Sequence, residues 1–493
     1  MKRILKKYPE KTIRFWEIII PATSWTIITM PIWLSFIYPE GVAYFVIGFD
    51  IYWFYKSFSL AFNSIRSYLT LSAHIKVDWL KEVKKIPGWE KIHHLIIIPQ
   101  YQERLSLLRK TLKNLSLQDF PHQEISVILA SEARDPRAKI KGQILKREFK
   151  NKFAHFWTTY HQLALDEVAG KSSNMAWAGK FACQKLKNLG FDLKNITVTS
   201  SDADVLLHPK YFSYLTFAFL SDPDRRYHFY QAAILFYSNI WQIPLPGRVL
   251  NTIGSILSLS LLSQGLRLIN FSTYSLSLKT VQEVGFWGVD IIPEDYHLFF
   301  KTYFKKGEKV KVLPIFLPVL AQAAQSRHFW QTMVNQYEQH KRWAWGVSDL
   351  PRVIKNYFLH PEIPFLDKTF RLAILLEQHL IWPTNWFILT LGSTIPPLIN
   401  PRFAKTVLGY KLAGISSTIL TLCAVFLLVI IFLDLKIKPP RPKEFVRWKT
   451  PILYLQWLTL PIVSFFLSAL PGLDAHTRLM LGKRLEYRVT EKV

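Results

Sequence analysis

The sequence predicts an α/β domain built on a mostly parallel sheet and flanked by transmembrane α-helices. Five apolar segments are long enough to cross a bilayer, which needs about 20 helical residues. They lie near residues 13–37, 41–62, 369–391, 406–433 and 451–470. The stretch between the second and third segments, about residues 90–325, has mixed polarity. Two apolar segments, a soluble domain and a membrane block therefore follow one another along the chain.

Within that stretch, short apolar runs alternate with segments of helical periodicity. Residues 95–98, 125–129 and 196–199 are predicted strands, whereas residues 104–117 and 176–189 carry apolar residues at helical spacing. Strands that alternate with helices favour a mostly parallel sheet. In such sheets, ligands bind beyond the carboxyl ends of the strands.

The distribution of charge predicts the orientation in the membrane. The formal net charge is +27, and basic residues gather in the N-terminal tail and in the loop 436–449. Cytosolic loops of membrane proteins are rich in Lys and Arg, so the N-terminus, the large domain and this loop are predicted to be cytosolic. A complete fifth span would place the basic C-terminus outside. Pro461 and Pro471 allow a re-entrant or interfacial segment instead.

The composition excludes two classes of site. The two cysteines, Cys183 and Cys423, lie far apart in the sequence, so they build neither a disulfide framework nor a Cys-based zinc site. The basic residues follow the apolar segments, and no aromatic-basic RNA-binding motif occurs. We therefore expect a lipid bilayer, and not nucleic acid, as a partner.

Asp202 and Asp204 follow the third predicted strand and are separated by one residue. Two carboxylates at a strand end can both reach one hard divalent cation, and Mg²⁺ or Mn²⁺ prefers such oxygen ligands together with substrate phosphates. The alternative is a solvated turn, where Asp is common.

Glu294 and Asp295 form an acidic pair before a helical run. One of these carboxylates is a candidate to take the proton from an acceptor hydroxyl. The alternative is a helix N-terminus, where acidic residues favour the macrodipole.

Gln339, Arg342 and Trp343 lie in a helical stretch before the second membrane block. Arg binds a diphosphate through two hydrogen bonds, and Trp offers a flat face to a sugar ring. The alternative is a basic amphipathic helix on the membrane surface, which is compatible with the first interpretation. Residues 315–320 and 330–345 are expected to lie on that surface.

Softer signals lie nearer the N-terminus. Lys171 follows Gly170 in a polar loop that lacks the Gly-rich lead of a Walker motif; it could meet a phosphate or simply be exposed. Tyr101 and Glu103 follow the first strand, where a base or ribose could bind.

The order of these motifs resembles glycosyltransferase family 2, and most of all its membrane branch with cellulose, hyaluronan and chitin synthases and ceramide glucosyltransferase. The resemblance covers roughly residues 90–350 and implies a GT-A (Rossmann-like) fold, a nucleotide-sugar donor and a divalent metal, Mg²⁺ or Mn²⁺. It rests on residues 99–103, Glu132, Gly170 with Lys171, Asp202 with Asp204, Glu294 with Asp295, and Gln339, Arg342 and Trp343.

The resemblance also implies roles where residues match. Asp295 would be the catalytic base with Glu294 in support, and Asp202 and Asp204 would bind the metal and the donor diphosphate. Trp343 would contact the acceptor. The remaining donor-binding residues would be Tyr101, Glu103, Glu132, Lys171, Gln339 and Arg342.

The sequence departs from the family pattern at three places. Gln102 stands where Asn is usual, and His340 stands where synthases carry Gln or Arg, which weakens a claim of processive synthesis. The usual acidic nucleoside motif is replaced by residues 131–135, which leaves Glu132 and Asp135 both open.

The function expected is an inverting hexosyl transfer from a UDP- or GDP-sugar to a hydroxyl of a membrane-associated polysaccharide or lipid on the cytosolic face. A non-processive transferase that adds one sugar per lipid is the second interpretation. A non-enzymatic scaffold or transporter is the third, and the intact acidic and QxxRW motifs argue against it. Polar residues within the apolar segments, such as Glu377, Gln378 and His379, would support a sugar path.

The domain boundaries follow from these observations. Residues 1–66 hold two transmembrane helices, 67–325 the cytosolic GT-A domain, 326–365 interfacial amphipathic helices with the QxxRW motif, and 366–493 a membrane block of two or three spans with a basic tail. The expected location is the plasma (inner) membrane, as a multi-pass protein.

Overall fold

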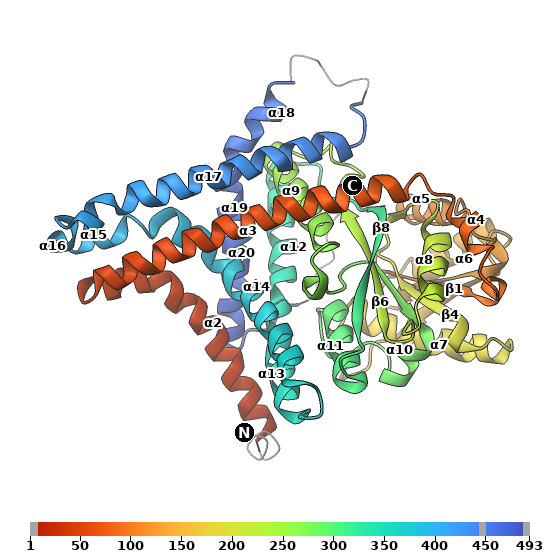
Figure 1. Cartoon of the computed structure of the whole chain (residues 1–493). Coiled ribbons are helices and arrows are strands. Elements are labelled where there is room, and N and C mark those ends of the chain that lie inside the picture. The colour runs from red at the N-terminus through yellow and green to blue at the C-terminus, as the bar shows by residue number, and fades with distance from the viewer. Residues whose placement is uncertain (1–7, 443–449, 487–493) are drawn as a thin grey trace.

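The structure is a computed structural model that describes residues 8–442 and 450–486 (Figure 1). Its α/β domain contains, within these residues, an eight-stranded sheet of order β3-β2-β1-β4-β7-β6-β8-β5. Long helices project from one side of this domain, away from the sheet.

Four strands form the parallel half of the sheet. They are β1 (His93–Gln100), β2 (Ile125–Glu132), β3 (His155–His161) and β4 (Ile196–Ser200). β1 pairs in parallel with β2 and β4, and β2 pairs in parallel with β3. The three predicted strands are β1, β2 and β4, so their existence and direction are confirmed; β3 has a partly buried, polar sequence that apolar periodicity missed.

The other half of the sheet is mixed. β7 (Tyr274–Ser277) is antiparallel to both β4 and β6 (His228–Leu235), while β8 (Lys311–Leu320) is parallel to β6 and pairs antiparallel with β5 (Leu206–Leu207). The expectation that residues 315–320 lie on the membrane surface is therefore wrong. They belong to β8, and alternate residues from Ile315 to Val319 are buried in the core.

Helices cover both faces of the sheet. They are α4 (Trp79–Val83), α5 (Leu105–Leu115), α6 (Ala138–Phe149), α7 (Lys171–Asn188), α8 (Tyr211–Ser221), α9 (Leu245–Leu261), α10 (Leu278–Val284) and α11 (Glu294–Lys306). In β1, Leu95 and Ile97 pack into the core beside α7, whereas Ile96 and Ile98 pack into the core on the opposite face. Alternation of side chains across a strand explains why a continuous apolar run serves both cores.

Long helices follow before and after the α/β domain. They are α2 (Pro9–Trp33), α3 (Pro39–His74), α14 (Phe365–Leu391) and α17 (Val407–Ile437). Between the domain and α14 lie α12 (Phe329–Ala344) and α13 (Leu350–Leu359), and α15 (Ile395–Ile399) and α16 (Pro401–Ala404) precede α17. α3 and α17 pack side by side, and each has its domain-proximal end at its C-terminus (Figure 1).

Residues 452–480 form one interrupted helical segment. It comprises α18 (Ile452–Leu455), a 3₁₀ turn, α19 (Leu460–Ser464), a π-helical turn at Phe465–Ala469 and α20 (Leu470–Met480). Of the described residues, three segments are long and apolar enough to span a membrane: Pro9–Phe36, Val407–Ile437 and Ile452–Met480. Charged residues within α3 and α14, among them Asp50, Lys56 and Glu377, lower the hydropathy of the other two predicted segments.

The first part of the segment 452–480 packs against α9, and its last part packs against α2 and α12. Its C-terminal end contacts the first part of α2, because Arg14 donates to the carbonyl oxygens of Leu479 at 2.8 Å and Met480 at 2.5 Å. Asp474 contacts α12 through Lys341 at 3.3 Å. Figure 1 shows the segment running across the direction of α3 and α17 rather than along it.

A buried acidic residue joins α17 to the sheet. Asp434, in the last turns of α17, accepts hydrogen bonds from the hydroxyls of Tyr237 at 2.9 Å and Thr252 at 3.3 Å. Lys438 pairs with the same carboxylate at 2.5 Å. The end of a membrane helix is thus fixed to the loop that follows β6.

An ion pair stabilises the parallel half of the domain and predicts a stability effect. Lys141 and Asp135 are both buried and lie 2.6 Å apart. Lys141→Met leaves a buried carboxylate without its cation, so we expect a loss of about 3–5 kcal/mol in unfolding free energy. Thermal unfolding in detergent measures this, with Lys139→Met on the exposed face of α6 as the control. Equal melting temperatures for the two variants would contradict the prediction.

Candidate active site

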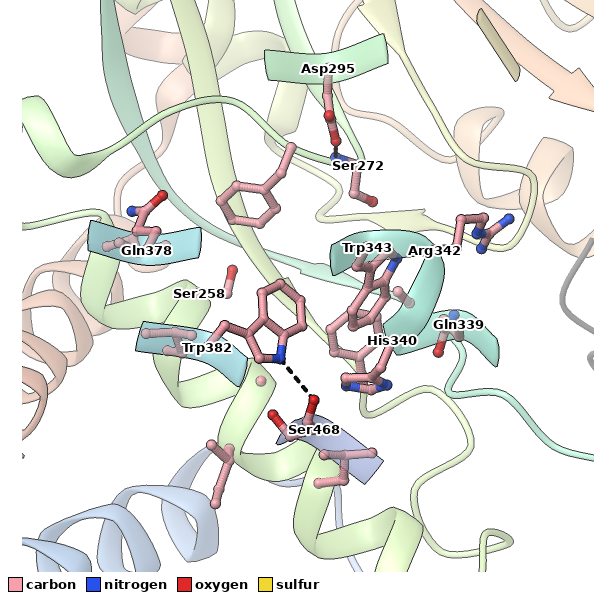
Figure 2. Close-up of a pocket in the computed structure, with 18 of the residues that line it drawn as sticks. Ser258, Ser272, Asp295, Gln339, His340, Arg342, Trp343, Gln378, Trp382 and Ser468 are labelled. Atoms are coloured by element: carbon pink, nitrogen blue, oxygen red, sulfur yellow. Dashed lines mark hydrogen bonds between the residues drawn. The ribbon is translucent and has the colours of Figure 1, made fainter. Parts of the chain in front are cut away.

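A cavity of about 1360 Å³ opens at the carboxyl ends of β1, β2 and β4 and continues between α3, α9, α14 and α17. Its wall includes every predicted site residue. Figure 2 shows the indole rings of Trp343 and Trp382 between the Asp295–Ser272 pair at one end and Ser468 at the other. One space therefore joins the strand ends to the membrane helices.

Lys171 connects the two acidic motifs. Its ammonium group lies 2.8 Å from Asp202 Oδ1 and 2.6 Å from Glu294 Oε1. Burial favours the neutral amine, but the two carboxylates outweigh it and hold the pKa of Lys171 well above its usual value. The polar loop expected at this residue is in fact the first turn of α7, which begins at Lys171.

Ser272 is a second bridge between the motifs, and no sequence motif points to it. Its backbone N–H donates to Asp295 Oδ2 at 3.1 Å, and its hydroxyl donates to Asp202 Oδ2 at 2.6 Å. Its carbonyl oxygen accepts a hydrogen bond from Lys171 at 2.7 Å. Ser272 has φ 55°, a left-handed conformation that costs a non-glycine residue energy and that these three hydrogen bonds offset.

Glu294 and Asp295 begin helix α11, so the helix N-terminus that was the alternative to a catalytic role is present as well. Glu294 is buried, and the hydroxyl of Tyr274 donates to it at 2.7 Å. Asp295 accepts hydrogen bonds from the backbone N–H groups of Tyr296 at 2.9 Å and Ser272. The two neighbours thus have different surroundings: one holds Lys171, and the other is held by backbone donors.

Burial raises the pKa of both acids. It raises the pKa of Glu294 to about 7, against the opposing effect of Lys171, and the charge of Asp295 adds to the rise. Burial also raises the pKa of Asp295, against Lys171 and the two backbone donors. A carboxylate with a raised pKa is a stronger base near neutral pH.

Asp202 and Asp204 both reach the cavity wall. Asp204 is buried and accepts a hydrogen bond from the backbone N–H of Gln322 at 3.0 Å. Among the residues that the structure describes, no group of three His, Cys, Asp or Glu side chains is placed to hold a metal. Two carboxylates fit Mg²⁺ or Mn²⁺ when substrate phosphates and water supply the remaining oxygens, which is the usual arrangement for Mg²⁺.

Tyr101, Glu103 and Glu132 line the cavity at the carboxyl ends of β1 and β2. The Glu103 carboxylate accepts a hydrogen bond from the backbone N–H of Tyr101, and the Arg134 guanidinium lies over the Tyr101 ring at 4.7 Å from its centroid. Arg134 also pairs with Glu132. Aromatic, cationic and acidic groups therefore gather where a base and a ribose would be bound.

Glu132 and Asp135, between which the sequence did not decide, have different surroundings. Glu132 lines the cavity. Asp135 is bound by Lys141 and by the backbone N–H groups of Gln102 at 3.2 Å and Arg137 at 3.0 Å. This geometry favours Glu132 as the donor-binding candidate and gives Asp135 a structural role.

Helix α12 brings Gln339, Arg342 and Trp343 to the cavity wall. The side-chain carbonyl oxygen of Gln339 is buried and has no hydrogen-bond partner among the described residues, so a bound ligand would satisfy it. Trp343 packs against Phe236 and His340, with ring centroids 5.7 and 4.7 Å away. Burial lowers the pKa of His340 to about 4, so this residue adds a ring and no charge near neutral pH.

Polar residues of the membrane block also reach the cavity. Glu377, Gln378 and His379 all line it, as does Asn385. Gln456 and Trp457, which also lie in an apolar segment, pack elsewhere, and Trp457 belongs to an apolar cluster with α9. The cavity thus borders on α14 but not on the first part of the segment 452–480.

Comparison with known families supports a glycosyltransferase. The family described as "Glycosyl transferase family group 2" matches residues 197–434, which include Asp202, Asp204, the acidic pair and the QxxRW motif. Together with the sheet topology, this match confirms the GT-A-like α/β fold with a mostly parallel sheet. Comparison with curated protein sequences finds no match.

Two solved structures are similar in part. The mannosyltransferase PcManGT from Pyrobaculum calidifontis, in complex with GDP-Man and Mn²⁺, has 11% identity and a TM-score of 0.45, covering 86% of this chain and all of its own. TarS 1–349 from S. aureus, in complex with UDP-GlcNAc, has 14% identity and a TM-score of 0.39, covering 68% of this chain and 92% of its own.

The bridge at Lys171 predicts a loss of both stability and activity. Lys171→Met leaves the buried Glu294 and the half-buried Asp202 beside each other without a cation, so unfolding free energy falls by about 3 kcal/mol. We expect a lower melting temperature and weaker donor binding, measured on the purified protein. Lys180→Met removes the same charge from an exposed position of α7 and serves as the control. Wild-type stability and donor binding in Lys171→Met would contradict this reading of the bridge.

Proposed function

We propose that this protein is an inverting glycosyltransferase that moves a sugar from a nucleotide-diphospho-sugar to a hydroxyl of a membrane-associated acceptor at the cytosolic face of the membrane. The observation that carries the proposal is that the predicted motifs are joined in one cavity. Ser272 and Lys171 join the Asp202 side of the cavity to the acidic pair, and α12 places Arg342 and Trp343 in the same cavity.

Donor binding follows from the charges along the cavity. Tyr101 would stack against the base, with Glu103 and Glu132 near the ribose. Arg342 and Lys171 would contact the diphosphate, since both are cations on the cavity wall. Asp202 and Asp204 would hold Mg²⁺ or Mn²⁺, which when bound neutralises charge on the departing diphosphate.

The reaction is a single displacement. Asp295 accepts the proton of the acceptor hydroxyl as its oxygen forms a bond to the anomeric carbon, and the bond from that carbon to the diphosphate breaks. Backbone N–H groups hold the Asp295 carboxylate in place, and Glu294 keeps Lys171 at the site. Because one displacement inverts the anomeric centre, no covalent sugar–enzyme intermediate forms.

The test of this function uses purified protein in lipid nanodiscs with Mg²⁺ or Mn²⁺ and a panel of UDP- and GDP-sugars. We expect Asp295→Asn to lower transfer at least about 100-fold, the usual contribution of a general base, and to leave donor affinity nearly unchanged. Released nucleoside diphosphate and product mass spectra measure transfer, and calorimetry measures donor affinity.

The matched control is Glu308→Gln, which changes an exposed acid just beyond α11. Asp204→Asn should remove the metal dependence of donor binding. Turnover retained in Asp295→Asn would remove this residue from its role as the base, and the absence of any donor binding would overturn the function as a whole.

We also propose a membrane topology in which α2, α3, α14 and α17 cross the plasma (inner) membrane and the segment 452–480 lies along its cytosolic surface. The segment starts after the domain-proximal end of α17 and ends against Arg14, which lies in the first turns of α2. A segment whose two ends lie on one side does not cross. This arrangement keeps the basic C-terminal region cytosolic, as the charge distribution favours.

Cysteine labelling tests the topology. In a background with Cys183 and Cys423 replaced, Lys483→Cys follows the segment and Glu40→Cys lies in the first turn of α3, next to the connection from α2. We expect a membrane-impermeant maleimide to label Glu40→Cys in intact cells and Lys483→Cys only in inverted vesicles. Labelling of Lys483→Cys in intact cells would show that the segment spans the membrane.

A further inference from the structure

An ion cluster lies on the cavity wall among the membrane helices. Glu377 of α14 accepts a hydrogen bond from Lys56 of α3 at 2.8 Å and pairs with Arg267 at 2.7 Å. Arg267 ends the 3₁₀ turn Gly265–Arg267 that follows α9, and the hydroxyl of Tyr52 also donates to Glu377. Lys56, Arg267 and Glu377 all line the cavity, with 29%, 24% and 21% of their side chains exposed.

The charges of this cluster do not balance. One carboxylate faces two cations, so the cluster carries a surplus of one positive charge. If the cluster only linked the helices to one another, a single cation would neutralise Glu377. An uncompensated second charge among apolar helices is costly. An anionic group in the cavity would compensate the second cation, and both Lys and Arg keep several N–H donors on their charged groups.

A short stretch of chain connects the cluster to the groups that hold the proposed base. Arg267 is followed by Asn270, whose side-chain amide donates to the carbonyl oxygen of Asp295 at 2.8 Å, and then by Ser272, whose N–H binds the Asp295 carboxylate. One short stretch therefore carries both a cation of the cluster and the groups that position Asp295. The cations assigned to the donor diphosphate, Lys171 and Arg342, come from other elements, α7 and α12.

One side of the cavity among the membrane helices is mostly apolar, while Ser258, Gln378 and Asn385 add polar groups elsewhere on the wall. Helices α3, α9 and α17 supply mainly hydrocarbon and aromatic surface on the apolar side: Leu60, Leu250, Ile253, Leu257, Phe426 and Leu427. A sugar polymer needs hydrogen-bonding partners along its path, whereas a lipid chain gains free energy by burial against such a wall. The wall suits a hydrocarbon chain.

We propose that the acceptor is an anionic lipid, whose chain lies against α3, α9 and α17 and whose phosphate-like group is bound by Lys56 and Arg267. The proposal rests on the function proposed above and specifies its acceptor. A hydroxyl of the same head group attacks the anomeric carbon and gives its proton to Asp295, while the sugar–diphosphate bond breaks. The products are a glycosylated anionic lipid and a nucleoside diphosphate.

The test measures binding without turnover. Protein in nanodiscs of phosphatidylcholine is titrated with dodecyl phosphate, with dodecanol as the uncharged probe and with inorganic phosphate as the probe without a chain. We expect Lys56→Met to weaken dodecyl phosphate binding about tenfold, the effect of one lost charge-assisted hydrogen bond, and to leave dodecanol binding unchanged. Arg66→Met, on an exposed face of α3, is the control and should bind as the wild type does.

A second variant separates charge recognition from misfolding. Lys56→Met combined with Glu377→Gln restores the surplus of one positive charge on Arg267, so binding of dodecyl phosphate should recover in part. Equal binding by the wild type and Lys56→Met, or inorganic phosphate binding as tightly as dodecyl phosphate, would overturn the proposal. Asp295→Asn should bind dodecyl phosphate normally, so this result stands apart from that of the transfer assay.

Discussion

The ammonium group of Lys171 between two carboxylates is the constraint on which the site depends. Lys171 holds Asp202, which follows β4, and Glu294, which begins α11, within 3 Å of the same nitrogen atom. These acids come from distant parts of the sequence and would repel each other without a cation between them. The position of Lys171 requires α7 to begin at this residue, and the left-handed Ser272 is stabilised by hydrogen bonds to both acidic motifs and to Lys171. The geometry of the acids is thus set by a charge balance that local sequence does not reveal.

The fold could be predicted from the sequence only where the pattern of apolar residues shows which strands are buried. The apolar runs at β1, β2 and β4 identified three of the four strands in the parallel half of the sheet, because central parallel strands are buried on both faces. β3, with its polar residues, and β8, with an apolar sequence that also suits a membrane surface, were beyond that signal. In the site, the acidic pairs and the QxxRW motif were recognisable because their residue types are chemically specific. Ser272 was not, because its role depends on a backbone conformation. Nor was the meeting of Lys56 and Arg267 at Glu377, because the two cations are 211 residues apart in the sequence.

The cavity gives the membrane helices a part in the proposed chemistry. The cavity is one space whose wall runs from the strand ends, past α12, to α3 and α14. The polar groups of α14 that looked out of place in an apolar helix, Glu377 and His379, face this space. They are therefore better described as residues that line the site than as polar interruptions of a membrane-spanning helix. This role also explains why α14 is less apolar than α17.

The hydrogen bond between Asp434 and Tyr237 has a consequence for the selectivity of the proposed reaction. It fastens the end of α17 to the loop after β6, so in the proposed topology the strand ends lie at a fixed height above the bilayer. A reaction centre at constant height acts as a gauge of length. With the proposed lipid acceptor, it would admit a head group whose hydroxyl stands the right distance from the hydrocarbon boundary, and a shorter or longer head group would present its hydroxyl at the wrong level.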